Sequence, residues 1–313
     1  MLKNHKKIDV VVIGAGPAGI GASLIFKKEG INFVLIEASA PGGKVNIAPR
    51  VDNYPNYHEI PGPDLAMELY KRLTDAKIEI SGEKVLSLTK ENNEFVVKTD
   101  QNTYIAKAVL VASGAEEKKL GLANEDRLFG KGVSYCAICD GHFYRGKTAA
   151  IIGGGNSALK EGVYLARIVK KLYVIHRRNE FRGLPKTLEE LKAIPSVEIL
   201  TPYIPLEIIG DETLKQLKIQ NKDTGEIRIL DVDGLFPLVG QNPNTEFIKI
   251  PGVIDEYRYI PVDNKTMMSS VEGLFAAGDV LPRVIKQIYL SEHDGMVASK
   301  SIVEYLKNKL LSN

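Results

Sequence analysis

The amino-acid sequence predicts an α/β fold built from two similar units, and three observations support this prediction. A β-branched strand, a glycine-rich turn, a helix and a second apolar strand follow one another near the N-terminus, and the same order returns in mid-chain. The strands are continuous apolar runs, which is typical of parallel strands buried on both faces. The 313 residues, 44% of them hydrophobic, are enough for two domains that each have a core.

The first unit begins with a buried strand at 8–13, a tight turn at 14–19 and a helix at 20–29. A second buried strand follows at 32–36. The segment 40–63 carries five prolines, three glycines and three asparagines, which predicts a long functional loop. The later elements that we expect are a helix near 64–76 and strands near 85–88, 95–98 and 108–112.

The pattern then starts again. A strand at 148–152, a glycine turn at 153–155, a helix at 157–168 and a strand at 172–175 repeat the plan of the first unit. A last apolar strand at 273–277 and a helix at about 294–306 close the chain. Because the second unit lies in mid-chain, the simplest layout is a discontinuous first domain, residues 1–117 and 246–313, with a second domain, residues 118–245, inserted into it.

The composition excludes several classes of protein. The 41 Lys and Arg residues against 39 Asp and Glu give a net charge of +2, so nothing indicates a nucleic-acid binder. The uncharged stretch 10–26 contains four glycines and a proline, and it is shorter than the roughly 20 apolar residues that a membrane span needs. We therefore expect a cytoplasmic protein without a membrane partner. Two cysteines are too few for a disulfide framework or a structural metal site.

The first glycine turn, Gly14-Ala15-Gly16-Pro17-Ala18-Gly19, fits the fingerprint of a dinucleotide-binding site. The first glycine permits the tight turn, the second lets a pyrophosphate approach the backbone, and the third lets helix and strand pack closely. The helix N-terminus then offers N–H groups to the phosphates. Glu37 ends the next strand, where its carboxylate can accept hydrogen bonds from a ribose.

A distant element favours FAD over NAD at this first site. Asp279 follows an apolar strand and Gly278, so its carboxylate could bond the hydroxyls of a ribityl chain, which NAD lacks. Taken alone, Gly278-Asp279 is more typical of an ordinary turn. Combined with the first fingerprint, it predicts an FAD site.

The second glycine turn, Gly153-Gly154-Gly155-Asn156-Ser157-Ala158, has the G-x-G-x-x-A form. The next strand ends in His176-Arg177-Arg178, and Arg182 follows, where an NAD site would offer an acid. Guanidinium groups suit the 2′-phosphate of NADPH, because they form charge-assisted bidentate bonds. The alternative is a solvated basic patch; the glycine turn beside it favours NADPH.

Both cysteines lie in one C-x-x-C, Cys136-Ala137-Ile138-Cys139, directly before Asp140. In a cytoplasmic chain this spacing favours redox chemistry, and a helix N-terminus would stabilise the thiolate that disulfide exchange requires. The alternative is a pair of buried, inert cysteines. Asp140 is either a proton donor and acceptor for the pair or a carboxylate at a helix start.

Together these motifs resemble the low-molecular-weight thioredoxin reductases of bacteria, which are FAD-containing pyridine nucleotide-disulfide oxidoreductases. The segment 132–141 is similar to their redox segment, 176–182 to their 2′-phosphate motif, and Gly42-Gly43, 53–55 and 278–280 to their FAD contacts. The resemblance covers nearly the whole chain. It implies two Rossmann-like domains of the three-layer ββα type, in which the NADPH domain carries the redox pair.

The resemblance also implies the course of the reaction. NADPH reduces FAD, FAD reduces the pair, Cys139 faces the flavin, Cys136 exchanges with thioredoxin, and Asp140 protonates the leaving thiolate. The NADPH domain rotates on a hinge, for which segments 114–122 and 239–247 are candidates, and the chain forms a homodimer. Lys131, His142 and Phe143 flank the pair and are candidates for thioredoxin docking.

The predicted site residues fall into three groups. The catalytic residues are Cys136, Cys139 and Asp140. The FAD-binding residues are Gly14, Gly16, Pro17, Ala18, Gly19, Glu37, Ala38, Gly42, Gly43, Lys44, Asn53, Val85, Gly114, Gly278, Asp279, Lys286, Gln287 and Ile288. The NADPH-binding residues are Gly153, Gly155, Asn156, Ser157, Ala158, His176, Arg177, Arg178 and Arg182.

Several residues depart from the family pattern near the flavin. Lys44 replaces a glutamine, 46–48 replaces threonines, Lys286-Gln287-Ile288 replaces Arg-Gln-Ala, and Glu292-His293 replaces a small pair. These departures keep two alternatives open. One is a related flavin-dependent disulfide reductase with a different electron donor or partner; the other is a non-catalytic redox sensor.

Overall fold

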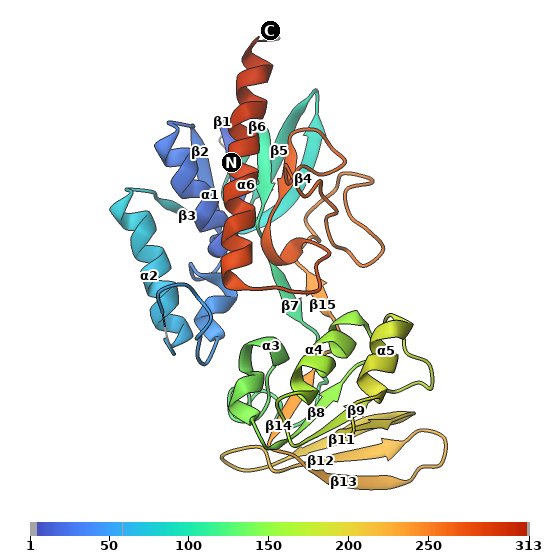
Figure 1. Cartoon of the computed structure of the whole chain (residues 1–313). Coiled ribbons are helices and arrows are strands. Elements are labelled where there is room, and N and C mark those ends of the chain that lie inside the picture. Colours follow the sequence, from blue (N-terminus) through green and yellow to red (C-terminus); the bar gives the residue numbers. More distant parts are fainter. Residues whose placement is uncertain (1–4, 58, 312–313) are drawn as a thin grey trace. The chain divides into compact units, whose positions relative to one another are not determined.

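The computed structural model describes residues 5–57 and 59–311, and the chain divides into two compact units. Unit 1 consists of the chain up to Glu116 and from Pro243 onward, and unit 2 is the segment Glu117–Asn242. The segment boundaries predicted from the sequence were 117 and 245, against 116 and 242 here. Each unit contains a sheet with parallel strands at its centre and helices against it (Figure 1), which confirms the predicted α/β class.

Unit 1 contains the following elements. Its strands are β1 (His5–Ile13), β2 (Phe33–Glu37), β3 (Ile80–Gly82), β4 (Val85–Glu91), β5 (Glu94–Thr99), β6 (Thr103–Val111) and β16 (Leu274–Ala276). Its helices are α1 (Pro17–Lys28), α2 (Gly62–Asp75) and α6 (Ile288–Leu311), with short 3-10 helices η1 (Gly43–Ile47) and η3 (Gly278–Val280).

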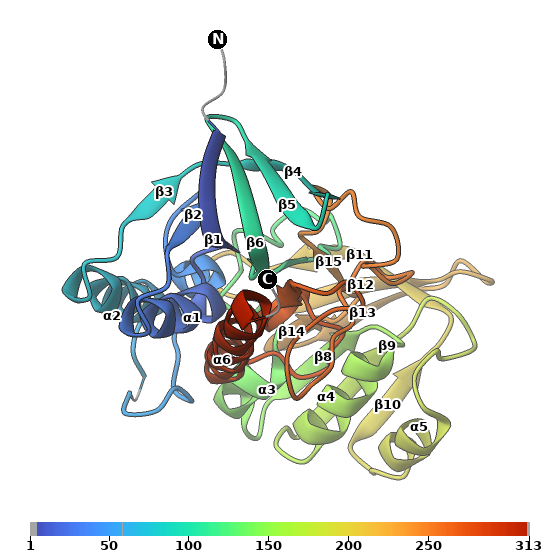
Figure 2. The same ribbon diagram turned by 90° about the horizontal axis from the view of Figure 1, so that it is seen from above.

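The sheet of unit 1 has the order β3-β2-β1-β6-β5-β4, and β16 also pairs with β6. Strand β6 pairs with β5 in antiparallel fashion along its first half and with β16 in parallel along its second half. Helices α1 and α6 lie side by side against the sheet (Figure 2). Residues Val10–Ile13, the last four of β1, are buried, as a parallel strand covered on both faces should be.

Unit 2 contains the remaining elements. Its strands are β8 (Thr148–Ile152), β9 (Lys171–Ile175), β10 (Val197–Leu200), β11 (Tyr203–Ile209), β12 (Gln216–Asn221), β13 (Ile227–Asp231) and β14 (Gly234–Pro237). Its helices are α3 (Ala137–Asp140), α4 (Asn156–Ala166) and α5 (Pro185–Lys192), with the 3-10 helix η2 (Gly141–Tyr144).

Three layers build unit 2 (Figure 1): helices α4 and α5, a parallel sheet in the order β10-β9-β8-β14, and an antiparallel sheet β11-β12-β13. The side chains of β8 alternate between the two interfaces. Ala149 and Ile151 join the helix-side core, and Ala150 and Ile152 join the core under the antiparallel sheet. Period-two alternation with apolar residues at every position explains why this strand is apolar throughout.

The chain passes between the units twice, at the segments predicted to form a hinge. Strands β7 (Ala115–Glu117) and β15 (Gln241–Pro243) pair there as a two-stranded sheet. Gly114 and Gly240, which precede the two strands, have φ of 71° and 114°. These left-handed backbone angles favour glycine at both crossings. That the units rotate about the crossings stays a prediction.

Some sequence-based boundaries were wrong. Helix α6 begins at Ile288 rather than near 294, and it ends at Leu311 rather than 306. Gly295 lies inside it, where a Cβ would overlap the carbonyl oxygen of Ala18 in α1. The glycine therefore marks close helix packing, not a helix boundary. In the described part of the chain, no helix is long and apolar enough to cross a membrane.

Candidate functional site

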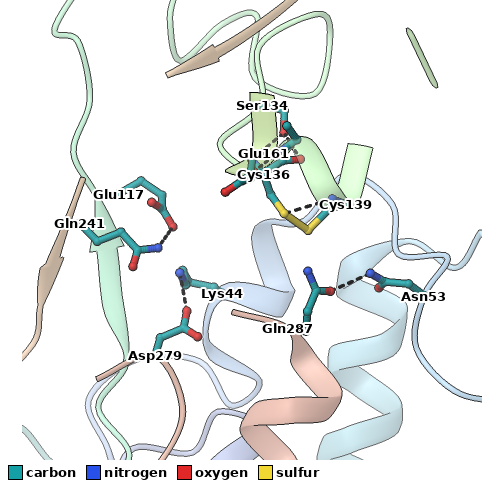
Figure 3. Close-up of a disulfide and its surroundings, with 11 residues drawn as sticks. Lys44, Asn53, Glu117, Ser134, Cys136, Cys139, Glu161, Gln241, Asp279 and Gln287 are labelled. Atoms are coloured by element: carbon teal, nitrogen blue, oxygen red, sulfur yellow. Dashed lines mark hydrogen bonds and ion pairs between the residues drawn. A yellow bond between two sulfur atoms is a disulfide. The ribbon is translucent and has the colours of Figure 1, made fainter. Parts of the chain in front are cut away.

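The two cysteines form a disulfide at the start of α3 in unit 2 (Figure 3). Cys136 is the N-cap of this helix, and its Sγ accepts a hydrogen bond from the N–H of Cys139 at 3.1 Å. The Oγ of Ser134 accepts the N–H of Cys136, also at 3.1 Å. Both cysteines are partly exposed, so the pair is within reach of a reaction partner.

The physical basis that the sequence suggested for thiolate stabilisation needs a correction. Helix α3 has only four residues, so it has no long array of aligned peptide dipoles. The N–H of Cys139 instead points directly at the Cys136 sulfur. This single donor would stabilise a thiolate on Cys136 once the disulfide is reduced.

Asp140 ends α3 and is partly exposed. Its N–H donates to the carbonyl of Cys136 at 3.1 Å, which fixes it one helical turn from the first cysteine. Burial, and then the nearby charges of Asp140 and Asp233, raise the pKa of Tyr144 to about 12. Asp140 therefore lies close to the redox pair, as a proton donor should. It also lies on the single turn of α3, as a carboxylate that interacts with the helix would, so the geometry is compatible with both interpretations.

Sequence reasoning missed a buried carboxylate behind the redox pair. Glu161 on α4 is 7% exposed, and its Oε2 accepts the N–H of Ala137 at 2.7 Å. Burial raises the pKa of Glu161 to about 7, although the N–H groups of Ala137 and Ile138 act in the opposite direction. The sequence signal that could have revealed Glu161 is an acidic residue among the apolar residues of the buried face of α4.

The first glycine turn has the backbone that the fingerprint requires. Gly14 has φ of 106°, and a Cβ on it would overlap the carbonyl of Ala112. A Cβ on Gly19 would overlap the carbonyl oxygen of Gly14, so helix and turn are in close contact. At Gly16, in contrast, a Cβ would have no neighbouring atom within 4 Å, and this open space is where a pyrophosphate can approach the backbone.

Glu37 closes this first turn from the end of β2. One carboxylate oxygen accepts the N–H of Ala15 at 2.7 Å, and the other accepts the N–H of Ser39 at 2.9 Å. Glu37 therefore holds the turn in place, and its carboxylate oxygens can accept further hydrogen bonds.

Two lysines surround Asp279, the acid predicted to bind a ribityl chain. Lys44 forms an ion pair with its carboxylate at 2.6 Å (Figure 3), and Lys286 donates to its backbone carbonyl at 2.5 Å. The ammonium of Lys286 also lies 4.3 Å from the ring centroid of Tyr259. The structure thus brings together three predicted FAD residues, two of which are departures from the family pattern.

Asn53 and Gln287, also predicted for FAD, meet in a second contact of unit 1. The amide of Asn53 donates to Oε1 of Gln287 at 2.7 Å (Figure 3), which connects the loop before α2 to the segment before α6. Ile288 is the first residue of α6. The other predicted FAD residues lie on the first turn and α1 (Pro17, Ala18), after β2 (Ala38), before and in η1 (Gly42, Gly43), at the start of β4 (Val85), at the crossing (Gly114) and in η3 (Gly278).

Glu292 and His293 lie together at another place in unit 1. The carboxylate of Glu292 pairs with Arg72 at 2.6 Å and accepts the hydroxyl of Tyr54 at 2.5 Å. Both residues line a cavity of about 410 Å³ with α2 and the loop 54–57. Burial and then Glu292 raise the pKa of Tyr54 to about 12. The structure therefore ties Glu292 to α2 rather than to Lys44 and Asp279.

The second glycine turn repeats this geometry with different side chains. A Cβ on Gly153 would overlap the carbonyl of Leu238, and Gly155 faces open space as Gly16 does. Asn156, the first residue of α4, accepts the N–H of Leu184 at 2.9 Å and so connects the turn to the segment before α5. Ser157 and Ala158 follow in the first turn of α4.

His176 differs from the three arginines with which it was grouped. Its ring is 5% exposed and lies so close to Gly154 that any Cβ there would overlap it. Burial, and then the neighbouring arginines, lower its pKa. Arg177, Arg178 and Arg182 are exposed. The arginines are therefore available to a phosphate, whereas His176 supports the turn from behind.

The chain matches the family model described as pyridine nucleotide-disulphide oxidoreductase over residues 8–295. It is 37% identical over 307 residues to the thioredoxin reductase of Mycoplasma pneumoniae, covering 98% of each chain. It is 39% identical to that of Helicobacter pylori, covering 96% of this chain and 99% of the relative. The crystal structure of the Streptococcus pyogenes thioredoxin reductase superposes with a TM-score of 0.89 at 33% identity, covering 97% of this chain and all of that one.

These similarities identify the class first: the chain belongs to the pyridine nucleotide-disulphide oxidoreductase family and, within it, to the low-molecular-weight thioredoxin reductases. The Cys136–Cys139 disulfide is its redox-active pair. Membership implies a flavin, a nicotinamide nucleotide and thioredoxin as substrate.

Proposed function

We propose that this chain is an NADPH-dependent thioredoxin-disulfide reductase that uses FAD, with Cys136, Cys139 and Asp140 as its catalytic residues. The observation that carries the proposal is the Cys136–Cys139 disulfide on a one-turn helix of the unit that also holds the second glycine turn. The Cys139 N–H, which donates to the Cys136 sulfur as part of the N-cap of α3, is in place to stabilise a thiolate there. That donor supports Cys136 as the thiolate that exchanges with thioredoxin.

The residues of unit 1 fit FAD. When bound, FAD supplies two-electron transfer between a nicotinamide nucleotide and a disulfide. The open backbone at Gly16 would admit its pyrophosphate, Glu37 would accept hydrogen bonds from its ribose, and Asp279 would bind its ribityl hydroxyls. Lys44 would hold the Asp279 carboxylate in place through their 2.6 Å ion pair.

The residues of unit 2 fit NADPH. The open backbone at Gly155 would admit its pyrophosphate, and the exposed guanidinium groups of Arg177, Arg178 and Arg182 would bind its 2′-phosphate. An acid at the end of β9 would repel that phosphate, whereas His176, whose pKa is lowered by burial, carries no negative charge. This arrangement favours NADPH over NADH.

Asp140 is proposed to hold and return the proton of the exchanging thiols. It lies one helical turn from Cys136 and is partly exposed, so it can exchange protons with solvent. Lys131 is exposed, and His142 and Phe143 are partly exposed with ring centroids 3.7 Å apart. We propose these three residues as the docking surface for thioredoxin.

Two further parts of the proposal concern the assembly and its compartment. We propose that two chains of 34.4 kDa form a homodimer. Sedimentation equilibrium should give twice the mass of one chain, and a mass of one chain at micromolar concentration would contradict the dimer. We place the enzyme in the cytoplasm, where reductases keep protein thiols reduced.

The test of the proposed function is an anaerobic assay of the FAD-loaded protein with an oxidised thioredoxin and one donor at a time. NADPH should support turnover at least 100-fold better than NADH, and reduced ferredoxin should support none. The matched control Cys139→Ser should bind FAD and show no turnover. Turnover with reduced ferredoxin but not NADPH would replace this proposal with the alternative donor.

A further inference from the structure

Glu161 is the buried ionisable group nearest to the redox helix that the proposed reaction leaves unused. Its Oε2 accepts the N–H of Ala137, the residue that follows Cys136, at 2.7 Å. The carboxyl group therefore lies against the peptide bond that joins Cys136 to the first residue of α3 (Figure 3). A buried carboxyl group at this position anchors α3. When it is ionised, it also repels a negative charge that forms on Cys136.

The surroundings of α3 show that Glu161 is its main polar anchor on α4. Gly141, directly after α3, packs against α4 so closely that a Cβ would lie 3.0 Å from Cδ1 of Leu165. On the other side, Ser134 bonds the N–H of Cys136. The N–H groups at the start of this helix are thus taken by Ser134, Glu161 and the Cys136 sulfur.

We propose that Glu161 is a positioning residue of the redox reaction: it holds the first turn of α3 and takes up a proton when the Cys136–Cys139 disulfide is reduced. The reaction breaks the S–S bond and adds two electrons, which the established activity supplies. One sulfur binds a proton and becomes a thiol, the other stays a thiolate, and the second proton goes from solvent to the Glu161 carboxylate. Oxidation by a substrate disulfide reverses each of these changes.

Charge is the reason for this coupling. A thiolate on Cys136 and a carboxylate one peptide bond away repel each other, and the burial of Glu161 weakens the screening by water, so formation of one charge favours protonation of the other group. In the oxidised enzyme the pKa of Glu161 is already raised to about 7, mainly by burial. Neutral pH is therefore the range in which a small change of charge moves its proton.

The other charged groups around Glu161 do not remove this effect. Glu117 on β7 adds negative charge and raises the pKa of Glu161 further. The remaining charged or titratable groups on the elements packed around it are Glu116 on β7, Asp140 on α3, His142 and Tyr144 on η2, Lys160 and Tyr164 on α4, Lys171 and Tyr173 on β9, and Lys186, Glu189, Glu190 and Lys192 on α5. Lys160 and Tyr164 are exposed, and Lys192 pairs with Glu189.

The test uses Glu161→Gln in the full-length, FAD-loaded protein, because glutamine keeps an acceptor for the Ala137 N–H and removes the charge. The rate of iodoacetamide alkylation of the reduced enzyme is measured from pH 5.5 to 9. We expect the apparent thiol pKa of the variant to be lower than that of the wild type, so that alkylation at pH 7.5, where Glu161 of the wild type is partly ionised, is about two-fold faster. Glu190→Gln, an exposed change on α5, is the control and should match the wild type.

A second measurement separates this role from a purely structural one. Equilibration with dithiothreitol at several pH values gives the number of protons bound per disulfide reduced. At pH 7.5 the variant should bind fewer protons than the wild type. Thiol pKa and proton uptake equal to those of the wild type in a folded variant would overturn the proposal, whether or not the enzyme reduces thioredoxin.

The wild type alone provides a check that does not depend on folding of the variant. Infrared difference spectra between oxidised and reduced enzyme at pH 7.5 should show a gain of protonated carboxyl on reduction. Absence of that gain would also overturn the proposal.

Discussion

The two glycine turns of this protein share one backbone plan but differ in the residue that closes each turn. Glu37 follows Gly14 by 23 residues, and His176 follows Gly153 by the same number. Glu37 is bonded to the turn through the Ala15 N–H, whereas His176 packs its ring on Gly154. Spacing and backbone are therefore shared by the two units, and we propose that the residue closing each turn, with its neighbours, determines which nucleotide that unit binds.

The same offset relates the helices that follow the turns. Glu161 in α4 lies eight residues after Gly153, and the residue eight after Gly14 in α1 is Ala22. Both are buried, but Ala22 belongs to the apolar core of unit 1 and Glu161 caps the redox helix of unit 2. The same position thus holds an apolar core residue in unit 1 and an ionisable residue in unit 2.

Removal of the arginine pair should break the nucleotide preference of unit 2. Arg177→Ala with Arg178→Ala would remove the two charge-assisted contacts proposed for the 2′-phosphate, and contacts of this kind contribute about 1.5–3 kcal/mol each. We expect Kd for NADPH to rise at least 100-fold while Kd for NADH changes little. Isothermal titration checks both, with Arg167→Ala, an exposed arginine paired with Glu190, as the control. An equal loss for the two nucleotides would show that the arginines do not read the 2′-phosphate.

The pH dependence of stability should distinguish Glu161 from Ala22. The pKa of Glu161 rises from 4.5 to about 7 on folding, so its favourable contribution is complete below pH 4.5 and is lost as the pH rises through 7. The unfolding free energy of Glu161→Gln relative to the wild type should therefore increase by about 3 kcal/mol between pH 4.5 and pH 8. Urea denaturation at both pH values measures it. A difference that does not change with pH would contradict the raised pKa.

The last position of the fingerprint is Gly19 in the first turn and Ala158 in the second. Exchanging these two residue types should show how closely each helix approaches its turn. Gly19→Ala forces a Cβ into the carbonyl of Gly14, and such overpacking costs about 1–3 kcal/mol. The reverse change, Ala158→Gly in α4, should cost about 1 kcal/mol, the ordinary loss of helix propensity. Chemical denaturation compares the two variants. Equal costs would mean that both turns tolerate a Cβ equally.

The smallest effect is expected at the Lys44–Asp279 pair. The Lys44 side chain is 39% exposed, so Lys44→Gln should change the unfolding free energy by less than about 1 kcal/mol. If Asp279 binds the ribityl chain, the variant should nevertheless change the affinity for FAD and the flavin midpoint potential, because the carboxylate is then free to move. Unchanged values for both would show that this departure from the family pattern has no effect on the flavin.

The glycine turns and the redox pair could be predicted from the sequence because their residue types have few structural uses. Gly14 and Gly153 need backbone that only glycine adopts readily, and the two cysteines lie in one C-x-x-C, so the turns and the pair could be found from spacing. The resemblance implied a second sheet in unit 2, but its strands were not located in the sequence; β13, for example, exposes Ile227 and Ile229.

Contacts between distant segments could not be predicted in the same way. Lys44 and Asp279 are far apart in sequence, and either could have faced solvent. Glu161 was missed because its partner is a backbone N–H of α3, which no side-chain pattern reveals. The burial of His176 against Gly154, beside three exposed arginines, could not be predicted either, and its role in NADPH binding stays a prediction.

The most direct test of the redox role of this disulfide is a count of thiols during anaerobic titration of the FAD-loaded protein with NADPH. We expect the first equivalent of NADPH to yield two new thiols per chain, both in the peptide that contains Cys136 and Cys139, before the flavin absorbance is fully bleached. Full bleaching of the flavin with no new thiols would contradict the central claim that this disulfide receives the electrons.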